Sequence, residues 1–157
     1  MLERTLVLIK PDGLRRGLEK EIKKRLLKGT GAKIIAEKQV NQVRRELADE
    51  HYFDLAERRG EAAKRRMVAF LLSGPIVAMI LEGERVVQKT REVVGGTEPI
   101  SAAPGTIRRD LASDSFEEAD REDRAVENLV HASGNKEEAE KEIALWFTPQ
   151  EISGRQD

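Results

Sequence analysis

The alternation of strand-sized apolar runs with segments of helical period constrains the fold most strongly. Arg4–Lys10 and Ile76–Leu81 are rich in β-branched and aliphatic residues and have the length of buried strands. Lys33–Val43 is a third strand candidate, and Leu129-Val130 is a short fourth that runs directly into His131. Because helical segments lie between these runs, the pattern indicates a sheet covered by helices.

The first expected helix carries Leu18, Ile22 and Leu26 at a spacing of four residues and ends near Gly29 and Gly31. Further helices are expected over residues 47–59, 61–67, 86–94 and a last segment whose apolar face is Ala139, Ile143, Trp146 and Phe147. This order fits an α+β sandwich of the ferredoxin-like, split β-α-β type with a four-stranded antiparallel sheet. A small doubly wound α/β fold also fits the pattern. With no internal repeat and no linker, residues 1–157 are expected to form one domain.

Charge and residue content exclude several classes of protein. The chain has 28 basic and 29 acidic residues, a net charge of −1, so nucleic acid or membrane binding by bulk charge is not expected. It has no cysteine, which excludes disulfide scaffolds, Fe–S clusters, thiolate zinc sites and cysteine nucleophiles. Met1–Arg4 does not have the pattern of a secretion signal, and the apolar runs are too short to span a bilayer. A soluble, cytoplasmic protein is therefore expected.

Two segments lack a helical or strand period. Thr97–Arg109 contains Pro99, Pro104 and Gly105 and is expected to be a long ordered or functional loop. Ala112–Glu127 is rich in acidic residues and is expected to be a solvated excursion from the domain. The sequence has no Rossmann or P-loop glycine motif, no nucleophile elbow, and no pair of histidines at zinc-ligand spacing.

The remaining candidates for a functional site are basic residues at the ends of predicted elements. Lys10 ends the first strand, Arg91 lies before Gly95-Gly96, and Arg108 ends the long loop. Each of them alone is more often a solvated surface charge than a functional group. His131 stands out, because the small residues that follow it leave room for a ligand and the next helix start can attract an anion. His51, inside a predicted helix, is expected to be a structural or a surface residue.

Three stretches, Lys10–Gly13 (KPDG), Pro104–Arg108 (PGTIR) and Asn128–Ser133 (NLVHAS), resemble the signature segments of nucleoside diphosphate kinases. Shorter matches follow in the same order and at similar spacings: Arg16–Leu18, His51-Tyr52, Ser73–Pro75 and Glu140–Ile143. The similarity runs from about Glu3 to Ile152, which is nearly the whole chain.

The resemblance implies transfer of the γ-phosphoryl group of ATP to a nucleoside diphosphate, in a ping-pong reaction through a phosphohistidine on His131. It implies phosphate binding by Lys10, Arg91 and Arg108, with Mg²⁺ held mainly by the nucleotide phosphates and no metal-ligating side chain. Further implied roles are nucleotide contacts by Tyr52, Thr97 and Asn128, and orientation of the histidine by Ser133 and Glu142. The resemblance also implies a homo-oligomer, either a hexamer or a tetramer.

The chain departs from the family pattern at three places. No aromatic residue lies between Phe53 and Phe70, where the family commonly stacks the nucleobase, so an arginine or an aliphatic side chain is expected there instead. Gly134 stands where an aspartate is usual, and the acidic segment 112–127 is longer than usual. The alternatives are a non-catalytic, nucleotide-binding regulatory protein of the same fold, and a ferredoxin-like assembly module whose basic residues are surface charge.

Overall fold

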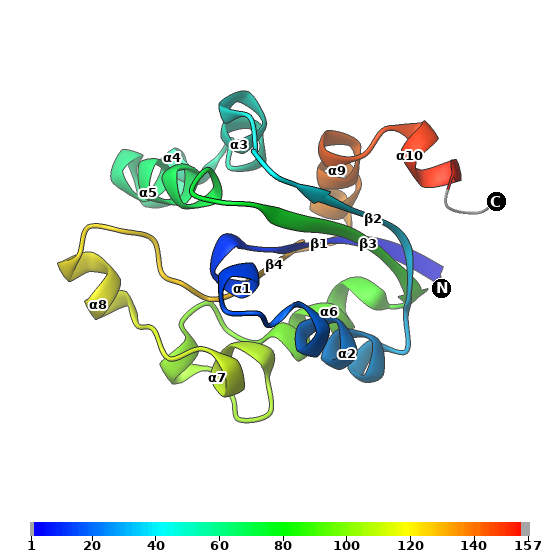
Figure 1. Cartoon of the computed structure of the whole chain (residues 1–157), viewed down its shortest axis with the longest axis horizontal. Helices are drawn as coiled ribbons and strands as arrows, with labels where there is room; N and C mark the ends of the chain where they lie inside the picture. Colours follow the sequence, from blue (N-terminus) through cyan, green and yellow to red (C-terminus); the bar gives the residue numbers. More distant parts are fainter. Residues whose placement is uncertain (1, 155–157) are drawn as a thin grey trace.

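A computed structural model describes residues 2–154 of the chain, which form a four-stranded sheet with helices on both faces (Figure 1). The strands are β1 (Leu2–Ile9), β2 (Lys33–Val40), β3 (Ile76–Glu84) and β4 (Val130–Ala132), in the spatial order β2-β3-β1-β4. Every neighbouring pair is antiparallel. This arrangement confirms the expected α+β, ferredoxin-like class and excludes a doubly wound parallel sheet.

Both faces of the central strands are buried, so two apolar cores lie on opposite sides of the sheet. Leu6 and Leu8 of β1 point to one core, and Val7 and Ile9 point to the other. Helices α3 (Arg45–His51), α4 (Leu55–Arg59), α5 (Glu61–Leu71) and α9 (Lys136–Trp146) contribute to the first core. Helices α2 (Glu19–Thr30), α6 (Val86–Val94) and α7 (Ile107–Leu111) contribute to the second (Figure 1).

The expected single helix over residues 47–59 was wrong, because α3 and α4 are separate helices. The break begins at Tyr52, whose φ of −104° and ψ of 34° leave the helical region. Its ring is buried in the first core, so tertiary packing overrides a helical pattern that the sequence continues. The second strand also ends at Val40 rather than Val43, and α5 continues to Leu71 rather than Met67.

The loop expected over residues 97–109 contains a 3₁₀ turn at Pro99–Ser101 and leads into α7. Thr106 begins this helix, because its side chain accepts a hydrogen bond from the backbone amide of Arg109. Three other short helices complete the described chain: α1 (Pro11–Arg15), α8 (Phe116–Arg121) and α10 (Pro149–Ser153). No helix in residues 2–154 has the length and apolar character needed to cross a membrane.

The acidic segment 112–127 is attached to the domain more firmly than a solvated excursion would be. Asp114 accepts hydrogen bonds from the guanidinium of Arg124 and from the backbone amide of Glu127. Asp120 and Asp123 pair with Arg66 of α5. These ion pairs join two segments that are far apart in the sequence, so the acidic charge lies against basic residues of α5.

Candidate active site

A cavity of about 390 Å³ lies where β1 and β4 end beside α3, α6 and α9. Its lining includes eight of the nine residues predicted to form the site: Lys10, Tyr52, Arg91, Thr97, Arg108, Asn128, His131 and Glu142. The ninth, Ser133, is fully buried and does not line the cavity. The register of β4 against β1 places His131 opposite Leu8, two positions from Lys10, which explains how distant motifs meet.

The ring of His131 is held by the carboxylate of Glu142 on α9. Nε2 of His131 lies 2.8 Å from Oε1 of Glu142, and the hydroxyl of Ser133 donates to the same oxygen at 2.8 Å. A carboxylate oxygen only accepts hydrogen bonds, so Nε2 must carry a proton. In a neutral imidazole the lone pair then lies on Nδ1, which is the nitrogen available to attack an electrophile.

Lys10 is buried at the end of β1, with 3% of its surface exposed, and it donates from Nζ to Oδ1 of Asn128 at 2.9 Å. Burial, together with the nearby Arg108, lowers the pKa of Lys10 to about 7, and Asp12 partly opposes the shift. The amide of Asn128 also donates to the backbone oxygen of Thr97 at 2.9 Å. Asn128 therefore fixes the lysine relative to the loop that carries Thr97.

Arg108 is held by three backbone oxygens, those of Gly95, Asn128 and Val130. Burial and the neighbouring Arg91 lower the pKa of Arg108 to about 10. Two cations whose charged forms are both disfavoured mark a site with unbalanced positive potential. Such a site can bind an anion, and three cationic side chains around one histidine suit a polyphosphate.

The rest of the lining extends away from these cations. Leu55, Arg58, Arg59 and Met67, on α4 and α5, line the same cavity. Nε of Arg58 pairs with a carboxylate oxygen of Asp54 at 3.1 Å. Phe53, which precedes α4, lines the cavity beside these residues, whereas no aromatic side chain of α4 or α5 does. None of residues 112–127 lines the cavity.

Gly134 leaves space that a neighbouring carboxylate fills. A Cβ atom at this position would overlap Oε2 of Glu138 and would lie 3.4 Å from Nη1 of Arg91. The carboxylate of Glu138, in the first turn of α9, occupies this place.

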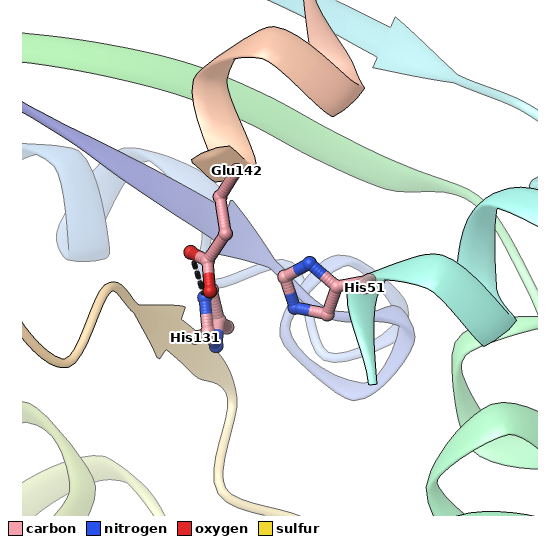
Figure 2. A group of neighbouring side chains, drawn as sticks. All are labelled: His51, His131 and Glu142. Carbon is pink, nitrogen blue, oxygen red and sulfur yellow. Dashed lines mark hydrogen bonds and ion pairs between the residues drawn. The ribbon is translucent and has the colours of Figure 1, made fainter. Parts of the chain in front are cut away.

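His51 lies next to His131, although the sequence analysis did not place it in the site. It is buried, with 7% exposed, and its ring packs edge-on against His131 with centroids 4.4 Å apart and planes at 75° (Figure 2). Its Nδ1 accepts a hydrogen bond from the indole Nε1 of Trp146 at 3.0 Å. These two residues are 95 positions apart, so no local sequence signal indicated the contact.

One ring nitrogen each of His51 and His131 and a carboxylate oxygen of Glu142 lie within 4.8 Å of one another, the single such metal-compatible group in residues 2–154. The hydrogen bonds do not fit a metal centre. An indole N–H can only donate, so Nδ1 of His51 carries the lone pair and Nε2 carries the proton. The protonated Nε2 cannot ligate a metal, and Mg²⁺ prefers oxygen ligands.

Comparison with known proteins agrees with this geometry. The family model described as nucleoside diphosphate kinase matches residues 3–152. A nucleoside diphosphate kinase of Thermus thermophilus is 44% identical over 151 residues, covering 96% of this chain and 99% of that protein. The corresponding relative in Pyrococcus furiosus is 42% identical, covering 96% of this chain and 86% of its own length.

Solved structures agree as well. A nucleoside-diphosphate kinase from Borrelia burgdorferi with bound vanadate and ADP superposes with a TM-score of 0.92 at 36% identity, covering 96% of this chain and 90% of that one. An NDP kinase from Pyrobaculum aerophilum gives a TM-score of 0.88 at 37% identity, covering 97% and 99%. These relatives are named as enzymes, which favours the enzymatic function over a non-catalytic role. From its sequence and its fold, this chain belongs to the nucleoside diphosphate kinase family.

Proposed function

We propose that His131 is the nucleophile that carries the phosphoryl group between two nucleotides. Nδ1 attacks the γ-phosphorus of ATP and forms a P–N bond, while the P–O bond to the β-phosphate breaks and its electron pair leaves with ADP. A nucleoside diphosphate then binds, and its terminal oxygen attacks the same phosphorus and returns the histidine to its free form. The observation that carries this proposal is the 2.8 Å contact of Nε2 with Glu142, which leaves the lone pair on Nδ1.

The cations supply the electrostatic part of the reaction. Phosphoryl transfer spreads negative charge over the equatorial oxygens, and fixed positive groups stabilise that charge. Lys10, Arg91 and Arg108 line the cavity together with His131, and we assign them to the phosphates. The cavity-lining Tyr52, Thr97 and Asn128 are assigned to the nucleotide as well. Because phosphates occupy this end, the base is assigned to the part lined by Leu55, Arg58, Arg59 and Met67.

The family works with a divalent metal, which we propose is Mg²⁺. The described side chains do not form a cage for it, since the one candidate group offers two histidine nitrogens and a single carboxylate, whereas Mg²⁺ prefers oxygen ligands. Mg²⁺ commonly binds substrate phosphates and keeps several waters, so the nucleotide itself supplies the ligands. The ion would neutralise phosphate charge, and the protein side chains would do the positioning.

We also propose a single domain over residues 1–157 and a homo-oligomer, either a hexamer or a tetramer. Strands from both halves of the chain share one sheet, which supports a single domain. Strand β2 lies at an edge of that sheet, and an edge strand is commonly covered by a partner. Exchange between nucleoside di- and triphosphates uses the nucleotide pool of the cytoplasm, which is the location proposed.

The decisive experiment is phosphorylation of the protein by ATP and Mg²⁺, followed by addition of a second nucleoside diphosphate. The expected result is an acid-labile, alkali-stable phosphoryl group on the wild type, none on His131→Ala, and transfer to the second diphosphate. A wild type that binds ADP without becoming labelled would instead support the non-catalytic alternative. A wild type whose melting temperature is unchanged by nucleotide would support the assembly module.

A further inference from the structure

The side chain of His51 holds a hydrogen-bond donor that no group in the described structure uses. Because Trp146 fixes the tautomer, the proton is on Nε2, and this nitrogen is buried without a partner. Leaving a buried N–H group unpaired costs folding free energy, so most buried polar groups have a partner in the protein, in ordered water or in a bound ligand. The unpaired Nε2–H group of His51 therefore suits a hydrogen bond to a bound ligand.

The unpaired donor lies beside the proposed nucleophile. His51 and His131 both line the cavity, and their rings meet edge to face with centroids 4.4 Å apart. In Figure 2 the ring of His51 extends from α3 toward His131, and Glu142 approaches Nε2 of His131 from α9. Glu142 thus occupies Nε2 of His131 and leaves Nδ1 open, while a ring nitrogen of His51 lies within 4.8 Å of a ring nitrogen of His131.

We infer that Nε2–H of His51 donates a hydrogen bond to an oxygen of the phosphoryl group while that group is on, or moving to, Nδ1 of His131. This inference rests on the proposed function. It makes His51 a further catalytic residue, and it makes Trp146 the positioning residue that fixes which nitrogen carries the proton. No proton is transferred in this contact, and no bond other than the hydrogen bond forms.

The charge state of His51 agrees with this role. Burial, together with the nearby His131 and Lys10, holds the pKa of His51 well below its usual range, so the ring stays neutral. A neutral donor stabilises the charge on a phosphoryl oxygen and, unlike a cation, does not raise the repulsion with Lys10 and Arg108. Its position is set by α3 and Trp146 before the nucleotide arrives, which is the condition for effective electrostatic stabilisation.

Two substitutions at residue 51 separate the donor from the packing. In His51→Asn, the amide oxygen can still accept from Trp146, but the shorter side chain does not reach the position of Nε2. In His51→Gln, the longer side chain can place an amide N–H near that position. We expect the single-turnover rate of His131 phosphorylation by ATP and Mg²⁺ to fall about 100-fold in His51→Asn, with ADP affinity nearly unchanged. The rate should recover in part in His51→Gln.

A folded His51→Asn variant with the wild-type rate would overturn the inference. A measurement on the unmodified protein covers the case in which a variant does not fold. In ¹⁵N-labelled protein, the Nε2–H signal of His51 should move downfield when ATP and Mg²⁺ phosphorylate His131, and an unchanged signal would also overturn the inference. In Trp146→Phe, the Nδ1–H tautomer should become visible and the phosphorylation rate should fall.

These outcomes are distinct from a failure of the proposed function. If the wild type is not phosphorylated, or if His131→Ala still is, then His131 is not the carrier. If the wild type is phosphorylated on His131 and His51→Asn reacts as quickly, only the role of His51 is wrong.

Discussion

Nε2 of His131 and Oε1 of Glu142 lie 2.8 Å apart, although one residue belongs to strand β4 and the other to helix α9. The serine hydroxyl of residue 133 donates to the same oxygen. Two donors therefore converge on one carboxylate oxygen, and this fixes both the tautomer and the orientation of the histidine. The proposed chemistry depends on that arrangement.

Replacement of Glu142 tests the arrangement directly. Glu142→Gln keeps an oxygen that can accept from Nε2 and should slow phosphorylation of His131 modestly. Glu142→Ala frees the ring and should slow it about 10- to 100-fold, the range found when a residue that orients a histidine is removed. Rapid-quench measurement with labelled ATP gives the rate. Glu140→Ala, on the exposed side of the same helix, is the matched control, and equal losses at both positions would contradict the assigned role.

The lowered pKa of Lys10 predicts a pH dependence of nucleotide binding. With a pKa of about 7 in the free site, the lysine loses its charge as the pH rises above 7. Phosphates favour the charged form, so ADP binding at pH 8 should take up a proton and ADP affinity should fall between pH 7 and 9. Calorimetry in two buffers of different ionisation enthalpy measures the uptake. Lys10→Met should bind ADP more weakly and lose this pH dependence.

The same shift has a consequence for the nucleotide-free protein. The unfolded chain binds the lysine proton with the ordinary pKa of 10.5, whereas the folded chain binds it only below about 7. Since the unfolded state holds more protons between these values, the contribution of Lys10 to stability increases with pH across that window. Urea unfolding of the wild type and Lys10→Met from pH 6 to 9 should show this difference. Parallel pH profiles in the two proteins would argue against it.

The part of the cavity assigned to the nucleobase, on α4 and α5, predicts a broad nucleotide preference. Met67 is an aliphatic surface there, and such a surface contacts any base without reading its edge. Met67→Ala should weaken the binding of ADP, GDP, CDP and UDP alike, by about tenfold, which corresponds to about 1.4 kcal/mol. Lys64→Ala, on the same helix and outside the cavity lining, is the control. A loss confined to one base would show that this part of the cavity reads base edges.

The lowered pKa of Asp114 predicts that segment 112–127 becomes less stable in acid. Burial opposes its ionisation, but hydrogen bonds from Arg124 and from backbone amides prevail, and the pKa of Asp114 is lowered. A carboxylate with a lowered pKa stabilises the fold above its usual pKa, and this contribution is lost as the pH falls through the folded value. Asp114→Asn should cost about 1–3 kcal/mol at pH 7. Denaturant unfolding should show the gap to wild type narrowing below pH 3.8.

Much of the fold could be predicted from local patterns. The apolar run of β3 and the four-residue spacing of Leu18, Ile22 and Leu26 correspond to elements that the structure contains. The helix break at Tyr52 could not be predicted this way, because burial of its ring against distant residues decides it. The short α7 was missed since five residues are too few to show a helical period.

The sequence by itself determined which chemical groups are present and in what order, and its motifs singled out the nine candidate residues. Their roles remain predictions. Only the tertiary structure decided how those groups are held. The pKa of Lys10 depends on burial beside Arg108, and the proton position on His51 depends on Trp146, 95 residues away. Solvent exclusion and hydrogen-bond direction are properties of three-dimensional packing, and residue order along the chain does not specify them.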